Sequence, residues 1–269
     1  MVQIFFGFFQ IIKFQFENFV NIYNTITPDY IWIIFLLFSF FSILIFLKLF
    51  GAIGLHVYTV IAIIAANIQV LKLVNFSFFP EPIALGTILF ASTFLCTDIL
   101  AEYYGVKKAR KNVLIGFAGF LLMTFFMLLT LGFRPLNETI TDEKYSWALD
   151  IQDNLLAIFL PLPIFFVASM IAYLFSQYFD VWFFDWLSKL TNKKLLWLRN
   201  NISTLISSLI DNIIFSLFAW IILNPNPLDF STVLFTFILG TYVLRIFIAL
   251  IDTPFVYLAR YILPDNKNE

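Results

Sequence analysis

The sequence predicts an all-α fold, a polytopic membrane helix bundle of about seven transmembrane helices preceded by an N-terminal interfacial helix. Composition is the first observation: the 269 residues are 61% hydrophobic and 12% charged, with a mean hydropathy of +0.93. A soluble globule needs about a quarter of its residues charged to cover its surface. The composition therefore excludes a soluble protein, and we expect lipid to solvate the chain.

The lengths of the apolar runs are the second observation. A hydrocarbon core about 30 Å thick needs roughly 20 apolar residues in a helix. Strands of a membrane barrel would alternate polar and apolar side chains, which these runs do not do. Helices are therefore the predicted spanning elements. The predicted spans are residues 30–50, 55–74, 83–104, 112–133, 154–178, 201–223 and 231–258.

Residues 1–29 are predicted to form an interfacial amphipathic segment. Large apolar side chains recur at three- or four-residue spacing from Phe5 to Tyr23, and polar side chains follow the same period on another face. A cleavable signal peptide is the alternative, but Lys13 and neighbouring polar residues interrupt the apolar stretch and no small-residue cleavage site follows. A second interfacial segment is expected at residues 181–190.

The distribution of Lys and Arg predicts the orientation. We expect residues 30–260 to form the transmembrane domain and residues 261–269 a short cytoplasmic tail. The two richest basic stretches are residues 107–111 and 189–199, and placing both inside puts eleven of the 16 basic residues inside and four outside. The N-terminus is therefore predicted outside and the C-terminus in the cytoplasm, in the cell (plasma or inner) membrane.

Several function classes are disfavoured by what the sequence lacks. With 16 basic and 17 acidic residues there is no basic field for nucleic acid. The single Cys96 and the single His56 argue against disulfides, metal sites and hydrolase triads. No Walker A, GxSxG, HExxH or dinucleotide-binding glycine pattern is present. We therefore expect no enzyme activity, no cofactor and no metal.

Charged residues inside the predicted spans are the first candidates for a binding site. Asp98 and Glu102 lie one turn apart on one face of the third span, and Asp211 and Arg245 lie near the middle of the sixth and seventh. Asp252 is about two turns deeper, level with Asp98. Each such charge costs at least about 2.5–3.5 kcal/mol near the membrane centre, so each needs a partner, a cavity or a ligand.

Structural alternatives exist for each of these charges. Glu102 is close to Lys107, so a salt bridge at the membrane surface is as reasonable as a binding role. Asp98 is predicted to bind a ligand or a proton, with a structural carboxylate as the alternative. Asp211 and Arg245 are predicted to face each other because sequential helices are usually neighbours. That pair is either a permanent structural contact or a part of the transport mechanism.

Two polar rows at helical spacing mark the sixth span, and they can line a cavity or simply hold helices together by hydrogen bonds. Asn67 and Gln69 of the second span are further candidates for the wall of such a cavity. Pro161 and Pro163 predict a kink early in the fifth span. The first row is Asn200, Ser203, Ser207 and Asp211, and the second is Asn201, Thr204, Ser208 and Asn212. The candidate substrate-binding residues are Asp98, Glu102, Asn67, Gln69, Asn200, Asn201, Asp211, Asn212, Arg245 and Asp252.

Three segments of the chain resemble the signatures of one family, the queuosine precursor transporters, formerly described as vitamin uptake transporters. The resemblance covers residues 55–260. It departs from the family pattern at Ser208, where a Gln is common, and at Arg245, where a Lys is frequent and the geometry of hydrogen bonding differs. The segments are Asp98 to Gly105 with the following Lys107, Lys108 and Arg110, then Leu196 to Thr204 continuing to Asp211, and Tyr242 through Arg245 to Pro254.

The resemblance implies import of deazaguanine bases, the precursors salvaged to make queuosine in tRNA. Its implied partners are that small molecule and the lipid bilayer, with homo-oligomerisation left open. The alternative is a substrate-capture subunit of a multi-component vitamin or nucleobase uptake system, energised by a separate ATP-driven module. From a different class, the chain could be an intramembrane enzyme or an assembly factor. Cys96 is a weak nucleophile candidate, because it and Asp98 lie about 200° apart around the helix.

Overall fold

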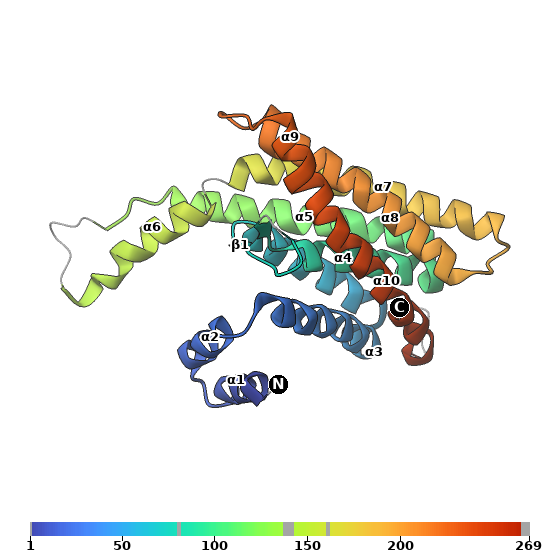
Figure 1. Cartoon of the computed structure of the whole chain (residues 1–269), viewed down its shortest axis with the longest axis horizontal. Helices are drawn as coiled ribbons and strands as arrows, with labels where there is room; N and C mark the ends of the chain where they lie inside the picture. The colour runs from blue at the N-terminus through green and yellow to red at the C-terminus, as the bar shows by residue number, and fades with distance from the viewer. Residues whose placement is uncertain (1, 80–81, 137–142, 160–161, 265–269) are drawn as a thin grey trace.

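The computed structural model describes residues 2–79, 82–136, 143–159 and 162–264, which form a helical bundle with one small β-hairpin (Figure 1). The prediction of an all-α membrane bundle is confirmed, while the count of seven spans stays a prediction. Within the described part of the chain, five helices are long and apolar enough to cross a membrane. They are Pro28–Gln69, Val106–Leu131, Ile164–Leu190, Leu196–Ile222 and Phe230–Ile262.

Helix α3 (Pro28–Gln69) reverses direction at one glycine. Gly51 has φ 60° and ψ −140°, values that break the helix and that only glycine adopts readily. The rings of Phe46 and Tyr58 then lie 6.4 Å apart, although twelve residues of straight helix would separate them by about 18 Å. The arms on either side of Gly51 match the first two predicted spans.

A two-stranded hairpin occupies the last two residues of the predicted second span and the first two of the third. Strand β1 (Leu73–Val74) pairs antiparallel with β2 (Ile83–Ala84). These strands were not predicted, because two-residue strands leave no period in an apolar run. The hairpin leads through Gly86, which has φ 96°, into α4 (Thr87–Ile99).

Helix α4 occupies the centre of the bundle. It contacts α3, α5 (Val106–Leu131), α7 (Leu162–Leu190), α8 (Leu196–Leu217) and α10 (Thr241–Ile262), and every residue from 91 to 100 is buried. A π-helical turn, Leu100–Tyr104, continues it to Gly105. Because α5 begins immediately afterwards, the basic residues 107–111 lie in its first turns and not in a loop, which corrects the prediction.

The predicted fifth span, residues 154–178, is wrong in its boundaries. A 3₁₀ turn, Glu143–Tyr145, leads into α6 (Trp147–Phe159), which projects from one end of the bundle (Figure 1). Helix α7 then runs continuously to Leu190, because no Gly or Pro interrupts residues 164–190. The expected separate interfacial segment at 181–190 is therefore part of α7. Pro163 lies in the first turn of α7, where a missing N–H is tolerated, and Pro161 lies outside the described residues.

The last two predicted spans are continuous helical segments. Helix α8 continues as a π-helical turn, Phe218–Ile222. After a short connection, α9 (Phe230–Thr232) and a π-helical stretch, Val233–Gly240, lead into α10. Asp229 caps α9 by accepting a hydrogen bond from the Thr232 N–H at 2.8 Å. Hydrogen bonds from Ser231 and Thr232 lower the pKa of the Asp229 carboxyl to about 2.

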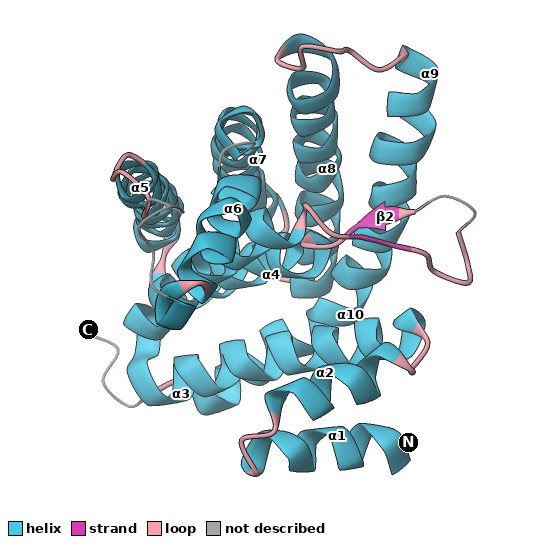
Figure 2. Cartoon of the chain, turned by 90° about the vertical axis from the view of Figure 1, so that its left-hand side faces the viewer, coloured by secondary structure: helices cyan, strands magenta, loops and turns pink. Residues whose placement is uncertain are grey.

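The N-terminal segment consists of two helices, which corrects the prediction of one. Helices α1 (Val2–Ile12) and α2 (Phe16–Asn24) are separated by a turn in which Phe14 has φ 57°. Phe8 contacts both Phe19 and Tyr23, with ring centroids 6.3 and 6.0 Å apart. The aromatic period is therefore divided between two helices that pack on each other. They lie beside α3 at the edge of the bundle (Figure 2), and their place at the membrane surface stays a prediction.

The basic stretches gather at one end of the bundle. This end carries the α7–α8 connection, the start of α5, the end of α10 and the reversal of α3 (Figure 1). Gly51 lies against Pro264 and Tyr104 there, and Arg199 donates to the Lys193 carbonyl at 3.4 Å. The positive charges predicted to share one side of the membrane are thus together in space. Which side is cytoplasmic stays a prediction.

The reversal of α3 predicts an intolerant position at Gly54. A Cβ atom there would overlap the backbone carbonyl of Phe46, and backbone cannot yield as a side chain can. Gly54→Ala should therefore destabilise the protein by at least about 1–3 kcal/mol. Thermal unfolding of the detergent-purified protein would measure the change. Gly132→Ala is the control, since Gly132 has φ −71° and its nearest neighbours belong to its own helix α5. Equal unfolding temperatures for both variants would contradict the close approach of the two arms.

Candidate functional site

A cavity opens between α4, α7, α8 and α10, at the end of the second α3 arm and of β2. Its interior volume, without open solvent, is about 50 Å³. Charged and polar side chains meet aromatic rings in its wall. The polar members are Thr87, Ser169, Asp211, Asn212, Ser216, Thr241 and Arg245, and the aromatic members are Phe90, Phe215, Trp220 and Phe237.

Asp211 and Arg245 form an ion pair in this wall, as predicted from their similar depths. The Arg245 Nη1 lies 2.6 Å from Asp211 Oδ2, and Ser176 donates to the other Asp211 oxygen at 3.0 Å. Both residues are only 7% exposed. Arg245 Nε has no hydrogen-bond partner among the described residues. The guanidinium therefore keeps donors available beside the cavity.

Two amides support the same wall. Asn212 donates to Thr241 Oγ1 at 2.9 Å and to the Ile238 carbonyl at 3.3 Å, which leaves its carbonyl oxygen available as an acceptor. Asn67 lies behind the wall and accepts a hydrogen bond of 2.8 Å from the lining residue Ser169. Of the predicted site residues, Asp211, Asn212 and Arg245 thus line the cavity, and Asn67 positions a lining side chain.

Aromatic rings form one side of the cavity. Trp220 and Phe237 are stacked, with centroids 4.5 Å apart and planes 30° apart, and Phe165 packs edge-on against Trp220 at 5.2 Å. Trp220 Nε1 has no partner among the described residues. A flat aromatic wall of this kind suits a planar ligand.

Asp98 lies outside the cavity wall, in a layer of buried polar groups. Its Oδ2 accepts from Thr204 at 3.1 Å. Asp180 of α7 lies in the same layer and accepts from Ser207 at 2.8 Å. Asp180 is not among the predicted site residues, because the predicted fifth span ends at residue 178 and α7 continues to Leu190. The polar residues Ser176 and Gln177, one turn earlier on the same helix, were the available signal.

The next layer joins α8 to α10 through the predicted residues Asn200, Asn201 and Asp252. Asn200 donates to Asp252 Oδ1 at 2.7 Å, and Asn201 donates to Thr253 Oγ1 at 2.7 Å. The carbonyl oxygens of both asparagines are buried and receive no hydrogen bond from the described residues. This layer lies between the layer of Asp98 and Asp180 and the basic end of the bundle.

Glu102 pairs with Arg199 and not with Lys107. Two parallel hydrogen bonds of 2.8 and 3.1 Å join the guanidinium to the carboxylate, and Ser188 accepts a third at 2.8 Å. Arg199 is fully buried, whereas the Glu102 side chain is 21% exposed. Arg199 was counted among the loop charges, but it lies in the first turn of α8. The π-helical turn after α4 presents Glu102 to it.

Two further residues named from the sequence are not among those that line the cavity. Gln69 ends the second arm of α3, and its Oε1 is buried without a partner among the described residues. His56, the single histidine, lies at the start of the second α3 arm, and its Nδ1 hydrogen-bonds to Asn112 Oδ1 of α5 at 2.8 Å. Asn112 also donates to Thr59 at 3.0 Å. His56 therefore joins α3 to α5.

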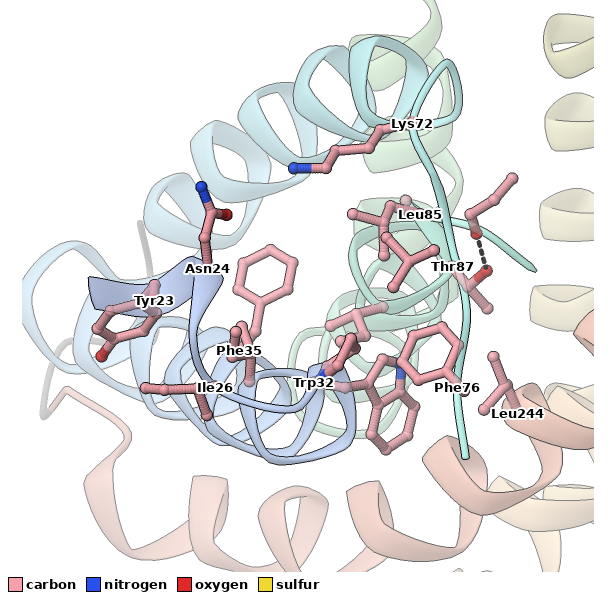
Figure 3. A pocket seen from close by; sticks show the side chains of 16 residues that line it. Tyr23, Asn24, Ile26, Trp32, Phe35, Lys72, Phe76, Leu85, Thr87 and Leu244 are labelled. Atoms are coloured by element: carbon pink, nitrogen blue, oxygen red, sulfur yellow. Dashed lines mark hydrogen bonds between the residues drawn. The ribbon is translucent and has the colours of Figure 1, made fainter. Parts of the chain in front are cut away.

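A larger, mostly apolar cavity of about 250 Å³ lies between α2, the start of α3 and the hairpin (Figure 3). Trp32, Phe35 and Phe76 point into it, while Asn24 and Lys72 stand at its rim. No acidic residue lines it. Its wall toward the smaller cavity is shared and consists of Ala84, Leu85 and Thr87. The smaller cavity carries the ionic chemistry and is the candidate site.

Comparison with known proteins identifies the family. The family model described as "Putative vitamin uptake transporter" matches residues 84–259. A Bacillus subtilis (strain 168) protein named "Probable queuosine precursor transporter" is 35% identical over 237 residues, covering 88% of this chain and 96% of the relative. The chain belongs to the queuosine precursor transporter family. No solved structure matches this chain.

Family membership agrees with the segments that carried the resemblance. The matched range contains α4, α5, α7, α8 and most of α10. It therefore contains the buried residues Asp98, Asp180 and Asp252 and most of the cavity wall. The chain is a multi-pass membrane protein and a transporter that handles a small molecule. The roles of single residues at the cavity stay predictions.

The ion pair at the cavity predicts a pattern of stability in three variants. Asp211→Asn or Arg245→Gln alone leaves one buried charge without its partner, which should cost about 3–5 kcal/mol. Combining them removes that penalty and should restore most of the loss. Thermal unfolding of the purified variants measures both effects. Asp185→Asn is the control, because its pair with Lys189 is largely exposed and is worth at most about 1 kcal/mol. A double variant as unstable as the single ones would refute the pairing as the cause.

Proposed function

We propose that this transporter imports queuosine precursors, the deazaguanine bases, across the cell membrane for salvage into tRNA queuosine. The observation that supports this most directly is the cavity between α4, α7, α8 and α10, which combines an ion pair, a free amide carbonyl and a stacked aromatic wall. The name of the Bacillus subtilis relative supports the same class of cargo.

The chemistry of the cavity suits a deazaguanine. Such a base presents N–H donors along one edge and a carbonyl acceptor beside them. The free carbonyl oxygen of Asn212 can accept from an N–H, and the remaining guanidinium donors of Arg245 can bind the carbonyl. A planar base stacked on Trp220 gains about 1–3 kcal/mol. We therefore propose Asp211, Asn212 and Arg245 as substrate-contacting residues, with Asn67 behind them.

The other predicted site residues do not line the cavity, and we propose different roles for them. Asp98, Glu102, Asn200, Asn201 and Asp252 form the polar layers between the cavity and the basic end. These layers would have to part for the substrate to pass. Gln69 lies beside the cavity-lining residue Val70 and is kept as a candidate for its rim.

The proposed cargo is tested in a strain that can neither make nor import deazaguanines. Expression of this chain should restore queuosine in tRNA when a deazaguanine base is supplied, and a vector control should not. Queuosine is measured in hydrolysed tRNA. Restoration without any supplied base, or none at any concentration despite normal membrane abundance, would contradict the proposal.

Trp220→Leu tests the proposed stacking wall. Loss of about 1–3 kcal/mol of stacking should raise the KM for uptake of a labelled deazaguanine about 5- to 150-fold. Membrane abundance is measured in parallel by immunoblot. Trp182→Leu is the matched control, since Trp182 is 51% exposed on α7 and lies away from the cavity. Equal KM values for the two variants would remove Trp220 from the site.

A capture subunit that depends on an ATP-driven module is the alternative within transport. The purified chain reconstituted alone into vesicles separates the two, because a permease exchanges labelled for unlabelled base without a partner and a capture subunit does not. We favour the permease, since the cavity and the polar layers that continue from it lie within one chain.

The proposed orientation has the N-terminus outside and the C-terminus in the cytoplasm. It rests on the basic stretches gathered at one end of the bundle and on the excess of Lys and Arg in cytoplasmic segments. A reporter that is active only in the cytoplasm should be active when fused after Glu269 and silent when inserted within residues 138–146. The reverse pattern would overturn the orientation.

A further inference from the structure

Three aspartates meet in the interior of the bundle without a basic partner. Asp98 of α4, Asp180 of α7 and Asp252 of α10 are 0%, 0% and 1% exposed. A neutral side chain of α8 hydrogen-bonds one oxygen of each. The three partners, Asn200, Thr204 and Ser207, follow one another within two turns of α8, so the carboxyl groups of the three aspartates are neighbours and interact electrostatically.

The remaining oxygens of this cluster have no donor. Asp98 Oδ1, Asp180 Oδ2 and Asp252 Oδ2 are buried and receive no hydrogen bond from the described residues, and the same is true of Asn200 Oδ1 beside Asp252. An ionised carboxylate only accepts hydrogen bonds, so two of them cannot bond to each other. One proton held between Asp98 and Asp180 supplies the missing donor and removes one negative charge.

No nearby cation balances the cluster. The buried arginines are already paired, Arg199 with Glu102 and Arg245 with Asp211. In the described ranges, no Lys, Arg or His nitrogen lies within 4.0 Å of the three carboxylates. Each unbalanced charge at such depth costs at least about 2.5–3.5 kcal/mol. Cys96 of α4 interacts with Asp98 and is uncharged in its ordinary form, and so are Tyr58 of α3 and Tyr173 of α7, which lie near Cys96.

Hydrogen bonds between α4 and α7 lie next in sequence to both the cluster and the cavity wall. Ser176 of α7 holds Asp211 in the cavity wall. The adjacent Gln177 donates to Thr93 at 2.9 Å and accepts from Thr97 at 3.1 Å. Thr97 precedes Asp98 in α4, and Asp180 lies one turn after Ser176 in α7. A shift of α4 against α7 would therefore change the wall of the cavity and the distance between Asp98 and Asp180 together.

We propose that Asp98 and Asp180 hold one transported proton between them, so that the chain moves its substrate together with a proton. This inference rests on the proposed function, because it assigns a co-substrate to the same transport cycle. The described residues contain no group of three or more His, Cys, Asp or Glu side chains arranged to hold a metal ion, and a proton needs only the two carboxyl groups. No bond other than the O–H bond forms or breaks: the proton is taken up on one side and released on the other.

The test uses the purified full-length protein in sealed vesicles, with a labelled deazaguanine base as the probe. Counterflow at equal pH measures exchange alone, and an acidic exterior measures proton-driven accumulation. For one proton moved with each neutral base, a gradient of one pH unit supports an accumulation of about tenfold. A proton ionophore should abolish it. Addition of unlabelled base should also acidify the lumen of wild-type vesicles, as followed with a trapped pH-sensitive dye.

Asp180→Asn should lose the proton-driven accumulation and the dye signal while it retains counterflow. Asp185→Asn, five residues later on α7, where the Asp185 side chain is 28% exposed and paired with Lys189, should behave as wild type. If counterflow is present in the wild type but a pH gradient drives nothing, the proton proposal fails and the proposed function stands. Accumulation driven by a sodium gradient would overturn it in favour of sodium. Absence of counterflow in the wild type would instead refute the proposed function. The wild-type dye measurement decides the proposal even if the variant does not fold.

Discussion

The buried polar face of α8 is the constraint on which the rest of the bundle depends. Lipid offers no hydrogen bonds, so the polar groups of this face need partners within the protein, and several find them on other helices. Arg199 binds the turn after α4, Thr204 binds α4, Ser207 binds α7 and Asp211 binds α10. These contacts repeat about every turn along one helix. Together they fix the register of α4, α7 and α10 against α8.

The contacts along this face differ in what they contribute. Neutral hydrogen bonds between membrane helices average about 0.6 kcal/mol, whereas breaking a buried ion pair costs about 3–5 kcal/mol. The pairs Arg199–Glu102 and Asp211–Arg245 therefore hold the two ends of the polar column. The aspartates between them have only hydroxyl and amide partners. The middle of the column is consequently the part where a change of protonation alters the balance most.

Much of this arrangement, but not all of it, could be predicted from the sequence. Depth along the helices was sufficient to pair Asp211 with Arg245, because both are fixed by helical rise within uninterrupted spans. Arg199 could not be assigned, since a buried arginine in a run of basic residues looks like a loop charge. Asp180 was not predicted, because the end of α7 was placed too early. The hairpin was not predicted, because two short strands leave no period in the sequence. Pairings between distant helices, such as Thr204 with Asp98, require the packing itself.

The position of Arg199 has a consequence for the conformational cycle. Fully buried beneath Glu102 and Ser188, it closes the basic end of the bundle with three hydrogen bonds, and the Asn200–Asp252 contact closes the layer above it. The cavity lies on the other side of both layers, and it shares the lining residues Ala84, Leu85 and Thr87 with the larger apolar cavity. The two sides of the cavity therefore differ. Two layers of polar contacts lie between the cavity and the basic end, whereas three shared residues lie between it and the larger cavity. In this structure the basic end is closed, and opening it requires α8 to separate from α4 and α10, whereas a local shift of the shared residues is enough to open the opposite side.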